Sequence, residues 1–251
     1  MFRLLGFLVR TIIKLKIVLL AVAGGMAFAY GLQAREQSRT WGLLPGDADR
    51  PLPGDDLVAR PDHVDTRSLL IDVPPAAVWP WLVQMGHGRG GWYGYGVLDR
   101  SWSPIGAAAG RSAESILPQF QDLAAGDVVP SHKGGGFVAR IVEADHALVL
   151  YLDDGILREQ TQALADEGSE GAARAVTEMQ DMPAFVLSWA FMLESEAGGR
   201  SRLVERIRMH MEMSGPQRRG VPFLGLGAFA LMRSQMLGIK RRAESGTPSA
   251  A

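Results

Sequence analysis

The chain has 251 residues, of which 47% are hydrophobic, and a formal net charge of −1. This length is sufficient for one domain with a sizeable core. The near-neutral charge argues against a nucleic-acid partner, because phosphate binding requires a clustered basic surface. The absence of cysteine excludes disulfides, thiol catalysis and cysteine-ligated metal centres.

The N-terminal part of the chain predicts a membrane anchor over residues 1–33. Residues 17–32 (IVLLAVAGGMAFAYGL) carry no charge, and four basic residues precede them: Arg3, Arg10, Lys14 and Lys16. The basic excess predicts a single-pass protein of the cell membrane, with a cytoplasmic N-terminus and an extracytoplasmic domain. Two alternatives stay open. One is a signal peptide cleaved near Ala29, giving a secreted protein, and the other is a soluble apolar helix.

The predicted domain covers residues 66–243, between an extended tether at residues 34–65 and a disordered tail at residues 244–251. The tether is predicted from its many proline, glycine and aspartate residues. Residues 66–73 predict a first strand. A helix is predicted from Pro74 to Gly86, because proline suits the first helical turn and glycine the end. Its apolar stripe has helical spacing: Val78, Trp81, Leu82 and Met85.

The remaining elements predict a run of antiparallel strands and a final helix. Alternation and turn signals place a short helix over residues 112–121 and strands over residues 127–130, 137–143, 147–152, 184–194 and 203–213. Residues 153–181, with eight acidic residues, predict a mobile or loosely helical insertion. A last helix over residues 222–242 has an apolar face: Phe229, Met232, Met236 and Ile239. This order predicts an α+β helix-grip fold, a curved sheet wrapped around the C-terminal helix with a cavity between them.

Two segments carry a resemblance to a known family. Residues 78–99 (VWPWLVQMGHGRGGWYGYGVLD) and 116–129 (ILPQFQDLAAGDVV) resemble the SRPBCC superfamily of START-like, polyketide cyclase/dehydrase-like and lipid-transport-like proteins. With RPLPGDDLV and GIKRRAE included, the resemblance extends over roughly residues 40–243. It implies a helix-grip fold and a hydrophobic ligand pocket, without implying a reaction. The acidic insertion departs from the family pattern, where a short hairpin would be expected.

The loop after the first helix contains a glycine motif and several aromatic residues. GHGRGG formally matches G-x-G-x-x-G, but it follows a helix, whereas a dinucleotide site requires the motif between a strand and a helix. Nucleotide binding is therefore not expected. Arg89, Tyr93, Tyr95 and Asp99 follow in or after this loop. They could provide polar contacts inside a cavity, or the aromatic side chains could cap the sheet while Arg89 pairs with a nearby carboxylate.

Glu205 is the polar residue that breaks an apolar strand face. It lies on the same strand face as Leu203, Ile207 and Met209. A carboxyl group on an apolar face needs a partner or a raised pKa. It could anchor a polar ligand atom or act as a general acid or base. A bulge could instead expose it, or an arginine could neutralise it. The five histidines show no ligand spacing, so neither a metal nor a cofactor is expected.

These features lead to three hypotheses. The first is a membrane-tethered carrier of a hydrophobic lipid, isoprenoid or polyketide-like molecule. The second is a cyclase- or dehydratase-like enzyme that uses Glu205, Tyr93 or Asp99 as acid or base. The third is a structural or stress-linked envelope protein whose cavity is empty or fully packed. The candidate ligand-binding residues are Trp81, Met85, Arg89, Tyr93, Tyr95, Trp189, Phe191, Glu205, Met209, Phe229, Met232 and Met236.

Overall fold

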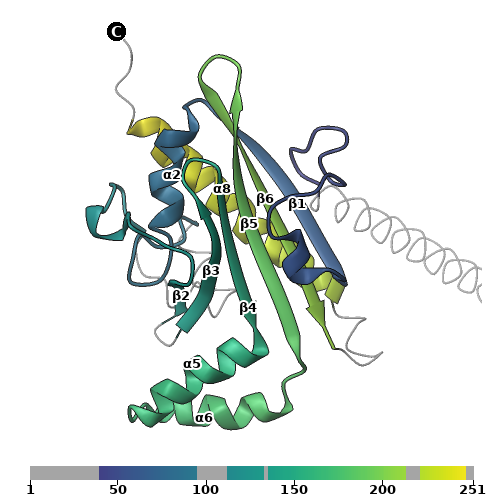
Figure 1. The fold of residues 1–251 in the computed structure, drawn as a ribbon, viewed down its shortest axis with the longest axis vertical. Helices are drawn as coiled ribbons and strands as arrows, with labels where there is room; N and C mark the ends of the chain where they lie inside the picture. The colour runs from purple at the N-terminus through teal and green to yellow at the C-terminus, as the bar shows by residue number, and fades with distance from the viewer. Residues whose placement is uncertain (1–39, 95–111, 133–134, 213–220, 247–251) are drawn as a thin grey trace, which may run out of the picture. The chain divides into compact units, whose positions relative to one another are not determined.

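The computed structural model describes residues 40–94, 112–132, 135–212 and 221–246. Six strands form one antiparallel sheet in the order β1-β6-β5-β4-β3-β2 (Figure 1). The strands are β1 (His63–Ile71), β2 (Val128–His132), β3 (Gly135–Glu143), β4 (Ala147–Asp153), β5 (Phe185–Glu196) and β6 (Arg200–Met211). The helices are α2 (Pro75–Val83), α5 (Asp154–Asp166), α6 (Glu170–Glu178) and α8 (Val221–Ser245), with short 3₁₀ turns η1 (Asp55–Val58), η2 (Pro118–Phe120) and η3 (Met179–Asp181).

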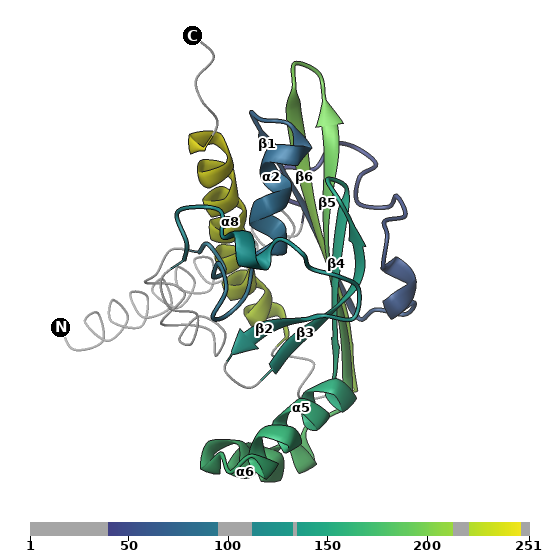
Figure 2. The ribbon, with the colours of Figure 1, turned by 60° about the vertical axis from the view of Figure 1, so that its left-hand side comes forward.

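Helices α2 and α8 lie together on one face of the sheet (Figure 2). Successive strand residues point to opposite faces, so every second residue of a strand points toward these helices. The main hydrophobic core fills the space between the two layers. Its inner-face and helix side chains include Ile71, Leu148, Leu150, Trp189, Phe191, Leu193, Leu203, Met232, Met236 and Ile239. The predicted α+β helix-grip class is therefore confirmed.

Helix α2 ends three residues before the predicted glycine, and the glycine loop that follows it folds back on the sheet. The amide of Gly90 donates to the carbonyl of Gln84 at 2.6 Å, and the amide of His87 donates to the carbonyl of Pro130 at 2.7 Å. The second bond covers part of the outer edge of β2, which is an edge strand of the sheet. The loop thus joins α2 to β2.

Helix α8 approaches this loop closely at Gly238. A Cβ atom on Gly238 would lie 1.9 Å from the carbonyl oxygen of Tyr93, so no other residue type fits there without a backbone shift. Tyr93 itself has a φ of 60°, in the left-handed region that non-glycine residues rarely adopt. The packing of α8 on the loop holds Tyr93 in this conformation.

Residues 47–58 are packed against the outer face of the sheet, whereas Trp41 lies at the edge of β1, where its carbonyl accepts from the amide of Ser68 and its ring meets Phe229 of α8. Neither part is the predicted extended tether. Arg206 of β6 is 2% exposed and makes five hydrogen bonds. Its guanidinium donates to the carbonyls of Asp47, Ala48 and Arg50 and to the carboxylate of Asp55, while its Nε donates to Thr66. We call residues 47–58 the outer strap. The composition of this segment predicted an extended chain. Nothing in the sequence pattern reveals that the guanidinium of Arg206 binds the carbonyl groups of the segment.

The acidic insertion forms two capped helices, α5 and α6, at one end of the sheet (Figure 1). The side chain of Asp153 accepts from the amide of Ile156 at 2.7 Å, and Ser169 accepts from the amide of Ala172 at 3.3 Å. Such N-caps typically stabilise a helix by about 1 kcal/mol. Gln160 also accepts from the amide of Gly136, which ties α5 to β3. The insertion is therefore more regular than the sequence suggested, whereas the helix predicted over residues 112–121 is reduced to η2.

The predicted membrane location needs correction. Crossing a bilayer requires about 20 predominantly apolar residues in one helix. No helix within the described ranges meets this requirement. Even α8, with 25 residues, contains Arg233, Lys240, Arg241 and Arg242. This finding contradicts the predicted single-pass location with an extracytoplasmic domain. Residues 17–32, and the alternative cleavage site near Ala29, lie outside the described residues.

The outer strap provides a first testable prediction. Arg206→Lys retains the charge but offers three donors to a buried site that uses five, so at least two acceptors lose their partner. We expect the free energy of unfolding in urea to fall by about 2–4 kcal/mol, and thermolysin to cleave faster within residues 52–58. Arg202→Lys is the control, because Arg202 lies on the same strand face and a lysine can retain its ion pair with Glu196. Equal effects of the two changes would contradict the role assigned to Arg206.

Candidate functional site

A buried cluster of charged residues lies on the inner face of the sheet. Arg67 of β1, Glu205 of β6 and Phe191 of β5 occupy one row of the sheet, because Arg67 pairs with Glu205 and Glu205 with Phe191. Arg67 and Glu205 are both 0% exposed, and Asp65, two residues before Arg67, is 2% exposed. Charged side chains are almost never fully buried without partners. The contacts of these three side chains therefore show which buried charges have partners and which do not.

Glu205 has a partner for one carboxylate oxygen only. The indole Nε1 of Trp189 donates to its Oε1 at 2.8 Å. Its Oε2 is buried and has no hydrogen-bond partner among the described residues. Burial raises the pKa of Glu205 to about 7, although the charge of Arg67 and the hydrogen bond from Trp189 act in the opposite direction. The side chain thus combines an unused oxygen with a pKa near neutrality.

Arg67 is engaged by Asp65 and by helix α8. Its NH2 donates to Asp65 Oδ2 at 2.7 Å, its NH1 donates to the sulfur of Met232 at 3.0 Å, and the guanidinium lies 5.4 Å from the ring centroid of Phe229. Asp65 Oδ2 is also 3.0 Å from Nε2 of His63. Burial acts to raise the pKa of Asp65, but the hydrogen bonds and charges of His63 and Arg67 outweigh it and the pKa is lowered. Asp65 and Arg67 therefore form an ion pair.

An aromatic wall adjoins the Glu205 carboxyl group. The rings of Trp92 and Trp189 are stacked, with centroids 5.5 Å apart and an interplanar angle of 7°. Phe137 meets both indoles edge-on, and Phe191 lies 5.1 Å from Trp189. Trp92 is 5% exposed, and its Nε1 has no hydrogen-bond partner in the described part of the chain. The interior thus contains a second unpaired polar atom, a donor, on the ring stacked against the one that binds Glu205.

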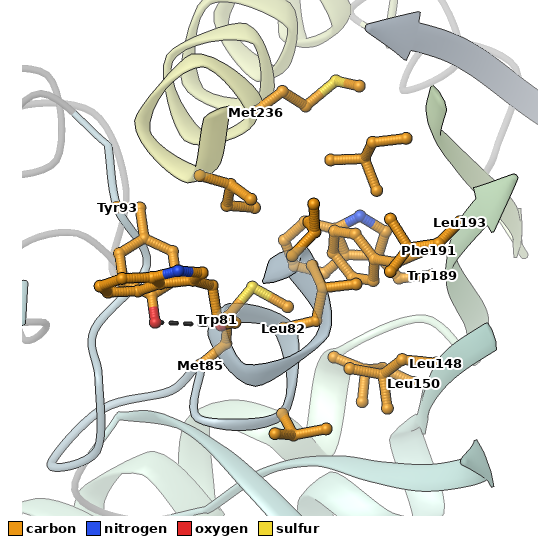
Figure 3. Packing of buried hydrophobic residues seen from close by; sticks show 14 of the residues in the cluster. Trp81, Leu82, Met85, Tyr93, Leu148, Leu150, Trp189, Phe191, Leu193 and Met236 are labelled. Atoms are coloured by element: carbon orange, nitrogen blue, oxygen red, sulfur yellow. Dashed lines mark hydrogen bonds between the residues drawn. The ribbon is translucent and has the colours of Figure 1, made fainter. Parts of the chain in front are cut away.

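Tyr93 and Arg89, both expected as ligand contacts, donate hydrogen bonds within the protein, whereas the buried Nε of Arg89 has no hydrogen-bond partner among the described residues. The hydroxyl of Tyr93 donates to the carbonyl of Trp81 at 3.0 Å (Figure 3), and burial raises its pKa well above the ordinary value. Arg89 NH2 donates to the carbonyl of Val83 at 2.8 Å, and its guanidinium lies 4.6 Å from the ring centroid of Phe120. Burial lowers the pKa of Arg89. Both residues hold the loop in place.

The apolar candidates are brought together between the sheet and the helices. Figure 3 shows Trp81 of α2, and Met85 just after that helix, across the core from Trp189 and Phe191 of β5, with Met236 of α8 above them. Met85, Phe191 and Met236 are fully buried, as is nearly all of Met232, whereas Met209 and Phe229 are partly exposed. Tyr95 and Asp99 lie outside the described residues.

Three parts of the site were not predicted from the sequence: Asp65, Arg67 and the N–H group of Trp92. The strand pattern does indicate a buried position for Arg67, because Arg67 shares a strand face with Leu69 and Ile71 just as Glu205 shares one with Leu203 and Ile207. Within the described ranges, no group of three or more histidine or acidic side chains could hold a metal ion. The site therefore consists of one ion pair, one half-paired carboxyl group and an aromatic wall.

Comparison with known proteins gives distant structural likenesses only. No protein-family model matches the chain, and no curated protein matches it. Among solved structures, protein MLL2253 from Mesorhizobium loti is 14% identical, and the match covers 74% of this chain and 100% of that one with a TM-score of 0.36. TTHA0849 from Thermus thermophilus is 8% identical over 74% and 100%, with a TM-score of 0.30. Ara h 8.0201 is 15% identical over 73% and 99%, with a TM-score of 0.26. None of these likenesses bears on the function of this chain.

The half-paired carboxyl group predicts a pH-dependent stability. The pKa of Glu205 is about 7 in the folded protein, against a reference value of 4.5. Between these values the folded protein binds more protons than the unfolded chain, so the free energy of unfolding falls as the pH rises. The full change is about 3 kcal/mol. Glu205→Gln cannot ionise, so urea unfolding across this range should show its stability rising relative to the unaltered protein.

The control for this measurement is Glu212→Gln, the same chemical change at an exposed position just after β6. It should shift the stability by a similar small amount at every pH. A stability difference between Glu205→Gln and the unaltered protein that stays constant from acid to neutral pH would contradict the raised pKa.

Proposed function

We propose that this protein binds a hydrophobic small molecule, such as a lipid, an isoprenoid or a polyketide-like compound, between the sheet and helix α8. The observation that carries the proposal is the buried Oε2 of Glu205, which has no partner among the described residues. A buried polar atom without a partner costs about 1–3 kcal/mol. Such atoms are rare in folded proteins, and a ligand that supplies the missing hydrogen bond is one reason for them to be kept.

The surroundings of Glu205 suit an apolar ligand body. Phe191, the cross-strand neighbour of Glu205, and Trp189, which donates to it, provide aromatic surface beside the carboxyl group. Met236 of α8 adds a thioether to the same buried core. Typical small-molecule sites have this composition, an apolar lining with a small number of placed polar groups. Methionine side chains also adapt to ligands of different shape, because they are unbranched and polarizable. The carboxyl group would then orient the polar end of the bound molecule.

A second candidate is an enzyme that uses Glu205 as general acid or base on the same kind of molecule. The pKa of about 7 supports this alternative, because general acid–base catalysis is most effective when the pKa lies near the working pH. Tyr93 does not suit the same role, since its hydroxyl donates to Trp81 and its pKa is raised. Asp99, the third candidate, lies outside the described residues.

Ligand binding is tested by making the same change, methionine to tryptophan, at one position on each side of the sheet. Met236→Trp enlarges a side chain on the inner side, and Met192→Trp makes the same change in the small outer cluster with Leu52 and Val204. Each overpacking change can cost about 1–3 kcal/mol of stability. We expect only Met236→Trp to weaken binding of the fluorescent probe N-phenyl-1-naphthylamine. The absence of probe binding to the unaltered protein would contradict the proposal and favour a filled interior.

The carrier and the enzyme are distinguished by the molecules that co-purify with the protein. Native mass spectrometry of the unaltered protein and of Glu205→Gln, both expressed in the same host and purified gently, gives the bound masses. A carrier should hold the same molecule in both proteins, at reduced occupancy in the variant. An enzyme should hold unconverted substrate in the variant and product, or nothing, in the unaltered protein.

A further inference from the structure

The buried charges of the inner face are not all paired. Asp65 and Arg67 form an ion pair, whereas Glu205 has no ion-pair partner among the described residues. Arg67 is the fully buried cation of this cluster, and it is already engaged by Asp65 at 2.7 Å and by the sulfur of Met232 at 3.0 Å. Glu205 is therefore the surplus acid of the cluster. A ligand that binds here meets a carboxyl group whose nearest cation is already paired with another carboxylate.

The two unpaired polar atoms have opposite hydrogen-bonding roles. Oε2 of ionised Glu205 can only accept, and Nε1 of Trp92 can only donate. Trp189 connects the two groups. Its Nε1 donates to Oε1 of Glu205, and its ring is stacked on that of Trp92 with the centroids 5.5 Å apart. A single small polar group between the indole edge and the carboxylate could satisfy both atoms if it both donates and accepts.

We propose that the polar end of the ligand is a hydroxyl group, which donates to Oε2 of Glu205 and accepts from Nε1 of Trp92. This inference rests on the proposed function and narrows its ligand class to apolar alcohols. A carboxylate can only accept, and it would add a second negative charge beside Glu205 while Arg67 is held by Asp65. An ammonium group can only donate, so it would leave the N–H of Trp92 buried and unpaired.

The ranking of three ligands that share one apolar chain tests this inference. Decanol, decanoic acid and decylamine are titrated against the full chain carrying N-phenyl-1-naphthylamine, at about pH 8, above the pKa of Glu205 of about 7. Decanol should displace the probe at a concentration about tenfold lower than decanoic acid, as expected from the loss of one hydrogen bond to a charged group. Decylamine should fall between the two, because it satisfies Glu205 alone.

Two variants assign this preference to the two atoms. Trp92→Phe retains an aromatic ring for stacking but removes the N–H donor, so decanol should bind about three- to tenfold more weakly while the probe still binds. Glu205→Gln removes the negative charge, so the difference between decanol and decanoic acid should shrink. The control Glu212→Gln changes an exposed carboxylate outside the core and should leave the ranking as it is.

The outcomes separate the two proposals. A protein that binds no probe contradicts the proposed function itself. A protein that binds the probe, but binds decanoic acid or decylamine as tightly as decanol or more tightly, overturns the hydroxyl assignment and leaves the binding function standing. An unchanged decanol affinity in Trp92→Phe, or an unchanged difference between decanol and decanoic acid in Glu205→Gln, also overturns it.

Discussion

The pairing register of β1, β6 and β5 is the constraint on which the site depends. It places Arg67, Glu205 and Phe191 in one row, with Trp189 diagonally adjacent on β5. Because strand side chains alternate between faces, a slip of one residue would move Arg67 and Glu205 to the outer face and bring Arg206 inside. The register is therefore held by two different polar arrangements at once, one on each face of β6.

The two faces of β6 satisfy their buried charges to different degrees. On the outer face, Arg206 makes five hydrogen bonds, and the outer strap is folded around it. On the inner face, Arg67 is paired with Asp65, but Glu205 uses one oxygen only. A structural role accounts for a fully paired charge such as Arg206, since removing one partner would destabilise the fold. It does not account for Glu205, and this contrast distinguishes the candidate site from the structural clusters.

The elements that follow from local pattern could be predicted, and those that depend on distant partners could not. The alternation in β5 and β6 and the helical spacing in α2 and α8 are local, and they were sufficient for the helix-grip class and for placing Glu205 on the inner face. The outer strap could not be predicted, because its conformation depends on Arg206, about 150 residues further along the chain. The buried position of Arg67 was not predicted, although Arg67 shares a strand face with Leu69. An arginine between Thr66 and Ser68 is typical of an exposed strand. The hydrogen bond of the Tyr93 hydroxyl could not be predicted either, because its partner, the backbone carbonyl of Trp81, has no sequence signal.

A half-paired carboxyl group at this position links stability to occupancy. In the protein without ligand, the unpaired oxygen and the loss of hydration both lower the free energy of unfolding, most strongly when Glu205 is ionised. The hydroxyl group of the proposed ligand would remove the first of these costs, and this gain is part of its binding free energy. Ligand binding adds stability by mass action equal to RT ln(1 + [L]/Kd). The same hydrogen bond therefore contributes to affinity and to folding, so a ligand that fills the apolar space without reaching Glu205 should stabilise the protein less than an equally large alcohol that does.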